Sequence, residues 1–395
     1  MSKNKVADVT WLGEVPENWM NLKLKFLCKI NTGSKDTQDK ISDGKYPFFV
    51  RSPHVETLNE FTHDEEAIMT AGDGAGVGKV FHYYKGKFVA HQRVYIFSKF
   101  KYVSGKYLYY YLASNLKFEV LLGGAKSTVD SIRKPMLSEF PVVFPNLKNQ
   151  EKITVFLDKK NNEIDNLIRI KEKSIELLKQ NRQALIIETV TKGLNSNVKM
   201  KDSAIDWVGV IPKHWETKPL KYSFKIMNGK EIEIELDIND DSGINVYGSG
   251  GLFKKTNQIL FEGESVLFGR KGTIGKPLYV NDSFWTVDTM YYTKFYKDSH
   301  PKWFFYLLLV YPWDMIITKT ALPSVVGSDV ANTVCAVPPL KEQVAIAKYL
   351  TLKDNEYFNL FNNINSQIKK LKEYRQALIY EAVTGKIDLC DIELD

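Results

Sequence analysis

The chain has 395 residues, of which 44% are apolar and 26% charged, so it is long enough for two or more domains with separate cores. No run of residues approaches the ~20 consecutive apolar positions of a membrane span, and the basic start lacks the apolar stretch of a secretory signal, so a soluble cytoplasmic protein is expected. A net charge of +7 and 13% aromatic residues suit contact with nucleic acid, although many basic proteins bind none.

Residues 1–147 form the first predicted domain, the first head, which we expect to be an α/β or α+β unit. It opens on WLGEVPENW (Trp11 to Trp19) and continues with the strand-like runs VGKVFHY and KFVAHQRVYIF, separated by Gly, Pro, Asn and Asp. The aromatic stretch KYLYYYL (Lys106 to Leu112) has helical spacing. It therefore predicts a helix that faces the core rather than a platform for stacking bases.

A long helix is predicted next, within residues 148–195. Pro145 precedes its start and Gly193 lies at its end, which are the residue types expected at those positions. At 1.5 Å per residue, a helix of ~40 residues is ~60 Å long, several times what one small domain needs for its core. We interpret it as a spacer.

The second half of the chain repeats the first, which indicates duplicated domains. The opening recurs as WVGVIPKHW (Trp207 to Trp215), and KWFFYLL follows from Lys302. GDGAGVGK (72–79) aligns without gaps to GRKGTIGK (269–276), PNLKNQEKI (145–153) to PPLKEQVAI (338–346), and RQALIIETVT (182–191) to RQALIYEAVT (375–384). A second head at residues 196–338 and a second helix with a short tail at residues 339–395 are therefore predicted.

Both predicted helices carry a seam with alternating steps of four and three residues, which is typical of a coiled coil. Its apolar positions are Ile164, Ile168, Ile175, Leu178 and Leu185 in the first helix and Phe361, Ile364, Ile368, Leu371 and Leu378 in the second. Two seams in one chain most economically pack against each other as an antiparallel pair, and dimerisation of two chains is the alternative. Lys171, Arg182 and Arg375 also fall on the seam, so we expect a partner or solvent there.

The complete pattern resembles the specificity subunits of Type I restriction-modification systems. The resemblance rests on the paired WxGxxPxxW openings, the PxLKxQ helix starts and the RQALI helix ends, and it covers nearly the whole chain. It implies two target-recognition domains, each followed by a helix, with the helices forming an antiparallel coiled coil. It also implies a subunit that binds two modification subunits to form an adenine methyltransferase, and two restriction subunits to form the nuclease.

Other motifs favour ordinary structural roles. GDGAGVGK is neither a P-loop nor a GxGxxG motif, so we interpret both glycine loops as tight strand-connecting turns whose glycines allow positive φ or close backbone approach to DNA. Asp206, Glu216 and Lys218 have the spacing of a metal nuclease motif, but the first copy lacks these residues. No adenine-methyltransferase motif or cofactor-binding glycine loop is visible. Cys28, Cys335 and Cys390 are scattered, which disfavours disulfides or a zinc site.

Polar and basic residues in the predicted loops are the candidates for DNA contact, because their side chains can form hydrogen bonds with bases or phosphates. In the first head they are Arg51, His54, Lys79, His91, Gln92, Arg93, Lys126 and Arg133. In the second head they are Ser249, Lys254, Lys255, Arg270, Lys271, Lys276 and Ser324. For any single residue, a solvated surface role is the competing interpretation.

Two similar reading domains held apart by helices predict recognition of two short DNA segments separated by unread bases. Because the heads differ in sequence, the two half-sites should differ. We expect no catalytic residue, metal or cofactor in this chain, with S-adenosylmethionine, ATP and Mg²⁺ on the partner subunits. The alternatives are a self-contained restriction or methyltransferase enzyme, and a coiled-coil adaptor that binds only protein.

Overall fold

The structure is a computed structural model that describes residues 4–6, 11–122, 131–318 and 322–389. The chain forms two compact units, the first consisting of Met1–Lys171 and Asn365–Asp395 and the second of Glu172–Ile364. The predicted domain bounds follow successive segments of the chain, whereas each unit combines one head with parts of both long helices. Lys126 and Cys390, both singled out from the sequence, lie outside the described residues.

The first head is built around one mixed sheet of six strands in the order β4-β9-β7-β8-β5-β6, in which only β5 and β8 pair in parallel. Its strands are β1 Asn4–Val6, β2 Glu14–Pro16, β3 Met20–Lys23, β4 Lys29–Thr32, β5 Tyr46–Phe49, β6 Val55–Leu58, β7 His63–Ala71, β8 Phe81–Ala90, β9 Val94–Ser98 and β10 Pro141–Phe144. Its helices are α1 Leu24–Leu27, the 3-10 turn η1 Thr37–Asp39, α2 Gly105–Leu122 and α3 Lys134–Glu139. The short pairs β1–β2 and β3–β10 lie outside the main sheet.

The second head has a similar element order, but it has two smaller sheets, β14-β20-β17-β18 and β16-β15-β19, in place of the six-stranded sheet. Its strands are β11 Met200–Asp202, β12 Val210–Pro212, β13 Glu216–Pro219, β14 Phe224–Asn228, β15 Ile244–Gly248, β16 Gly251–Thr256, β17 Ser265–Gly269, β18 Leu278–Val280, β19 Phe284–Thr286, β20 Met290–Phe295 and β21 Val334–Val337. Its helices are η2 Leu220–Tyr222, α5 Pro301–Leu309, η3 Trp313–Met315 and α6 Gly327–Asn332. Where the first head has the continuous strand β8, polar residues 281–283 separate β18 from β19, which splits the sheet.

The two predicted long helices are confirmed as α4, Leu147–Lys192, and α7, Leu340–Val383. Gly193 and Gly385, which follow them, have φ of +76° and +74°, the left-handed conformation in which glycine commonly ends a helix. Within the described residues, no helix combines the length and the apolar character that crossing a membrane requires.

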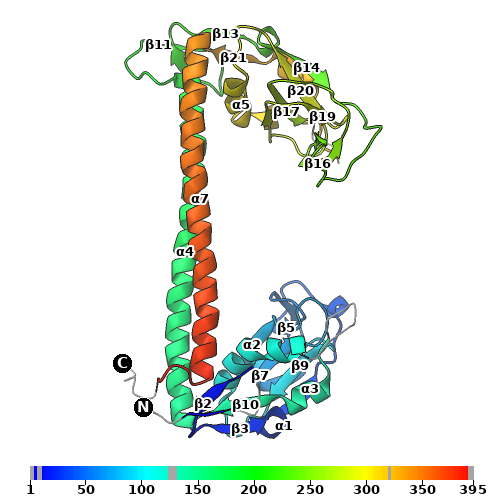
Figure 1. The fold of residues 1–395 in the computed structure, drawn as a ribbon, viewed down its shortest axis with the longest axis vertical. Helices are drawn as coiled ribbons and strands as arrows, with labels where there is room; N and C mark the ends of the chain where they lie inside the picture. Colours follow the sequence, from blue (N-terminus) through cyan, green and yellow to red (C-terminus); the bar gives the residue numbers. More distant parts are fainter. Residues whose placement is uncertain (1–3, 7–10, 123–130, 319–321, 390–395) are drawn as a thin grey trace. The chain divides into compact units, whose positions relative to one another are not determined.

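Segments of α4 and α7 run side by side in each unit (Figure 1). In the first unit, Lys171 Nζ donates to Gln367 Oε1 at 2.5 Å, and Arg375 Nη2 donates to Asp165 Oδ1 at 2.5 Å. The residue number falls along α7 as it rises along α4, so the segments are antiparallel, as predicted. In the second unit, Arg182 on α4 pairs with Asp354 on α7. The helices therefore pack on each other within one chain, and the basic seam residues find polar partners on the facing helix.

The aromatic helices α2 and α5 lie in the cores of the two heads. Tyr107 and Tyr111 of α2 and Trp303 and Tyr306 of α5 are almost fully buried. The interpretation of these stretches as core-facing helices is therefore confirmed, and a role in stacking on bases is not available to these buried rings.

Candidate nucleic-acid interface

Asp73 lies at the centre of a polar cluster in the first head, directly after strand β7. Its carboxylate accepts hydrogen bonds from Arg51 Nη1 at 2.5 Å and from Arg93 Nη1 at 3.1 Å. Arg51 follows β5, and Arg93 precedes β9, so three loops converge on one carboxylate. Both arginine side chains remain partly exposed, at 40% and 58%, so each keeps donors available for an outside acceptor.

The glycine loop 72–79 holds this cluster in place through its backbone. Gly72 N–H donates to Arg93 O at 2.9 Å, and Gly72 O accepts from Ile132 N–H at 2.8 Å. A Cβ on Gly76 would lie only 2.5 Å from Arg51 O, so a larger residue there would displace the Arg51 loop. The loop is thus a tight turn, and its Gly74 and Gly78 have positive φ, as the sequence indicated.

His91 and Gln92 lie in the loop that leads to Arg93. His91 is 3% exposed, and its Nδ1 accepts the Arg93 backbone N–H at 3.0 Å. Burial and the nearby Arg51 charge lower the pKa of His91, which keeps its ring neutral and able to accept this bond. Gln92 Nε2 donates to Asp36 Oδ2 at 2.7 Å. The His91 ring is therefore buried and bonds to the backbone of Arg93; it does not lie at the surface.

The other candidates of the first head differ in their surroundings. His54, Lys79 and Arg133 are exposed, and Arg133 is the residue before helix α3. Ser131, two residues earlier, forms a β-bridge with Asp73, which brings the start of this segment to the cluster.

The second head converges on Arg270, which occupies the position of Asp73 in the ungapped alignment of the glycine loops. Its backbone N–H donates to Thr289 O at 2.8 Å, and its carbonyl accepts from Val325 N–H at 2.9 Å. The neighbouring Lys271 forms a β-bridge with Ser324. A Cβ on Gly272 would lie 3.0 Å from Ser249 Oγ, so the predicted segments around residues 249, 270 and 324 meet here.

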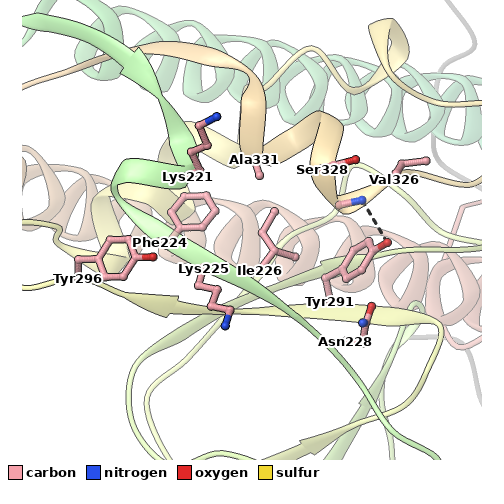
Figure 2. A pocket seen from close by; sticks show the side chains of 11 residues that line it. Lys221, Phe224, Lys225, Ile226, Asn228, Tyr291, Tyr296, Val326, Ser328 and Ala331 are labelled. Atoms are coloured by element: carbon pink, nitrogen blue, oxygen red, sulfur yellow. Dashed lines mark hydrogen bonds between the residues drawn. The ribbon is translucent and has the colours of Figure 1, made fainter.

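Tyr291 connects this loop to a pocket of about 450 Å³ on the same head (Figure 2). The Arg270 guanidinium lies 5.8 Å from the centre of the Tyr291 ring. The Tyr291 hydroxyl accepts from Gly327 N–H at 3.1 Å and donates to Val325 O at 3.4 Å. Lys225 and Asn228 of strand β14 also line the pocket. Sequence reasoning missed these three residues, because they lie in a strand pattern that indicates only packing.

Two of the remaining basic candidates of the second head form contacts away from the Arg270 loop. Lys254 pairs with Glu235 at 2.5 Å, and Lys255 Nζ donates to the Asp240 carbonyl oxygen. Lys276, at the end of the glycine loop, is exposed.

All ten predicted apolar seam residues are buried or half-buried; Leu378 belongs to the core cluster of the first head, and Leu185 packs against that of the second. Ile164, Ile168, Ile368 and Leu378 are buried. The half-buried members are Ile175, Leu178, Leu185, Phe361, Ile364 and Leu371.

The repeated motif glutamines join each head to its helix pair, a role that the sequence alone did not reveal. Gln150 Oε1 accepts from Ser104 N–H at 2.8 Å, and its Nε2 donates to the carbonyls of Tyr102 and Pro145. In the second unit, Gln343 Oε1 accepts from His300 N–H at 2.8 Å, and its Nε2 donates to Asp298 O and Pro338 O. Both side chains are buried, so the conserved position in the two copies is structural.

The motif tryptophans pack where a long helix ends. In the first unit, a Cβ on Gly385 would lie 3.1 Å from the Trp19 ring, and in the second a Cβ on Gly193 would lie 3.1 Å from the Trp215 ring. Trp215 Nε1 also donates to Glu342 Oε2 at 3.0 Å. These contacts join each motif opening to the end of a long helix.

Burial raises the pKa of both described cysteines, Cys28 and Cys335, to about 12, which keeps them as protonated thiols. Within the described part of the chain, no three His, Cys, Asp or Glu side chains gather in a way that could hold a metal ion.

Comparisons with known proteins agree with this architecture. The family model described as Type I restriction modification DNA specificity domain matches residues 16–180 and again residues 212–370. The chain is 26% identical over 412 residues to the Type I restriction enzyme MjaVIII specificity subunit of Methanocaldococcus jannaschii, with 94% of each chain covered. It is 31% identical over 174 residues to the EcoDI specificity subunit of Escherichia coli, which covers 44% of this chain and 38% of that protein.

Two solved structures share the fold. One comes from a study of complex assembly and conformational transition of the type I R-M system; it has a TM-score of 0.72 at 13% identity and covers 94% of this chain and 99% of its own. The HsdS subunit from Thermoanaerobacter tengcongensis has a TM-score of 0.51 at 14% identity, covering 94% and 98%. Because the family model matches both repeats and most of the chain, this protein belongs to the Type I restriction-modification specificity subunit family, whose role is DNA recognition.

Proposed function

We propose that this chain is a non-catalytic DNA-recognition subunit that reads a bipartite, asymmetric target. The observation that carries the proposal is a reversal of charge on a shared scaffold. In both heads a strand leads into a glycine loop that converges with two other loops, but the central side chain is Asp73 in the first head and Arg270 in the second. Because Asp73 accepts from Arg51 and Arg93, the first head presents the remaining donors of two guanidinium groups held by one carboxylate, whereas the second presents the single Arg270 guanidinium beside the Tyr291 ring. Guanidinium groups suit guanine or phosphate, and these two arrangements place them differently. The two half-sites should therefore differ.

The mechanism that we propose is positional. Exposed lysines and arginines contact phosphates and fix the register on the duplex, while the loop clusters select the bases. The helix pair, together with the parts of the heads that pack on it, would bind two modification subunits. A flipped adenine in each half-site would enter a modification subunit. Two restriction subunits would complete the nuclease. S-adenosylmethionine, ATP and Mg²⁺ would bind to these partners, and the assembly would act in the cytoplasm.

The test is a domain exchange read out by mapping methylated adenines. The full chain is produced in a methylation-deficient host with its modification subunit, and genomic DNA is sequenced for N6-methyladenine. We expect one bipartite asymmetric motif. Replacing residues 1–147 with the head of another subunit should change one half of the motif, and replacing residues 196–338 should change the other half. Each exchange serves as the control for the other.

Three results would contradict the proposal. Methylation or cleavage of DNA by the purified chain alone would indicate that it is itself an enzyme. An absence of DNA binding by the chain together with its partners would favour an adaptor that binds only protein. A change in both half-sites after one exchange would show that the heads do not read independently.

A further inference from the structure

A small cavity of about 210 Å³ in the first unit lies where the glycine loop, α2 and the C-terminal part of α7 meet; we call it the α2–α7 pocket. Lys79 comes from the loop, Ser114 and Lys117 come from α2, and Gln376 and Ile379 come from α7. It is therefore the one place among the described pockets of this unit where a candidate DNA-binding residue and a long helix share a cavity.

The lining is suited to an anion. It contains two lysines and no carboxylate, and neither lysine forms an ion pair with a side chain that the structure describes. Ser114 is 9% exposed and belongs to the same lining, so its hydroxyl offers a hydrogen-bond donor to a bound anion. The Gln376 amide adds further donors.

The second repeat fills the same place with protein. Val310 stands at the position of Ser114, and Trp313 stands at the position of Lys117. A Cβ on Gly275, the counterpart of Gly78, would lie 3.3 Å from the Trp313 ring. Trp313 is 6% exposed, and its Nε1 donates to Leu308 O at 2.9 Å. The polar, cationic lining is thus a feature of the first repeat and not a requirement of the fold.

We propose that the α2–α7 pocket binds one phosphate group of the DNA backbone. This inference rests on the proposed function and adds a contact that only the first head makes. The pocket is smaller than the ~300 Å³ or more of typical small-molecule sites, so a single phosphate fits it better than a nucleotide. DNA is favoured as the source of the phosphate because Lys79 ends the glycine loop. Near the start of the same loop, Asp73 binds the candidate DNA-contacting residues Arg51 and Arg93. A phosphate held by Lys117 and Gln376 ties the DNA register to helix α7.

The test uses the full chain and a 30-base-pair duplex of random sequence, because phosphate contacts do not depend on sequence. Affinity is measured by fluorescence anisotropy across a range of KCl concentrations. Lys117→Gln should lower the slope of log affinity against log salt by about 0.9 and the affinity at 0.1 M salt about fivefold to tenfold. Ser114→Val with Lys117→Trp, which imports the second repeat's residues, should do the same. Lys159→Gln, an equal change of charge on exposed helix α4, is the control and should leave the slope unchanged.

The outcomes separate this inference from the proposed function. A duplex bound with the same slope by wild type and Lys117→Gln would overturn the phosphate pocket while leaving DNA recognition intact. Unchanged duplex binding together with weaker binding of the modification subunit would assign the pocket to a carboxylate of that partner, which also overturns the inference. A wild-type chain that binds no duplex, either alone or together with its modification subunit, would contradict both. Thermal unfolding checks that each variant is folded, and Lys117→Gln keeps the test decisive if the tryptophan variant is not.

Discussion

The two units join their heads to the helix pair through matching buried contacts but through different charged ones. Gln150 and Gln343 make equivalent sets of hydrogen bonds. Farther along the helices, Tyr306 donates to Asp354, which also binds Arg182, so that α5, α7 and α4 share one polar triad.

In the first unit the corresponding tyrosine and arginine bind different residues of α4. Asn161 stands in place of Asp354, and Tyr110 bonds to Asp158 and Asn161 on α4. Arg375 turns instead to Asp165, one helical turn away. We call the contact region between a head and the helix pair its joint. Both joints keep the buried hydrogen bonds of the motif glutamine, which water cannot replace, whereas the charged contacts at the helix surface have diverged.

The largest effect should come from removing the tryptophan at either joint. Trp215 is 1% exposed and Trp19 is 5% exposed, so replacement with Ala should destabilise the unit that contains it by about 3–5 kcal/mol. Trp215→Ala should cost the more of the two, because it also removes the bond to Glu342. Hydrogen exchange resolved by segment would show which unit opens. Equal loss of protection in both units from either variant would contradict the view of two separate joints.

Arg182→Met and Arg375→Met are matched variants that compare the Arg182–Asp354 ion pair of the second unit with the Arg375–Asp165 ion pair of the first. Asp354 is 24% exposed, so losing Arg182 leaves a half-buried carboxylate with fewer donors and should cost about 1–3 kcal/mol in the second unit. Asp165 is 62% exposed, and Arg375 Nε is buried without a partner in the described structure. Arg375→Met should therefore change the first unit by less than about 1 kcal/mol. Urea unfolding followed by segment-resolved exchange measures both, and a larger cost for Arg375→Met would refute this ranking.

The sequence was sufficient to predict the parts of the fold that repeat. Steps of four and three residues define a helix seam without tertiary information, and the ends at Gly193 and Gly385 require only local chemistry. The split of the second sheet depends on strand pairing around residues 281–283, which no local pattern specifies. The candidate interface was predicted only as loops. The sequence does not show that Asp73 binds Arg51 and Arg93 or that His91 is buried, because both depend on how distant loops meet in the folded head.

The smallest expected effect is a difference in acid sensitivity between the units. In the first head, burial lowers the pKa of His63, His82 and His91, whereas in the second it lowers that of His300 alone. A lowered pKa means that the unfolded chain binds protons more readily than the folded chain. The stability that these histidines contribute is complete above their ordinary pKa of about 6.5 and is lost as the pH falls below it.

Acidification from pH 7 to pH 5.5 should therefore weaken the first unit more than the second. The loss cannot exceed about 1.4 kcal/mol per histidine for each pH unit, and the partial exposure of His63 and His82 makes their share smaller. Hydrogen exchange at both pH values, corrected for the intrinsic dependence of exchange on pH, compares the units within one molecule. His91→Gln should reduce the difference, because a side chain that cannot titrate removes one of the three contributions. An equal or greater loss in the second unit would show that groups other than these histidines control acid stability.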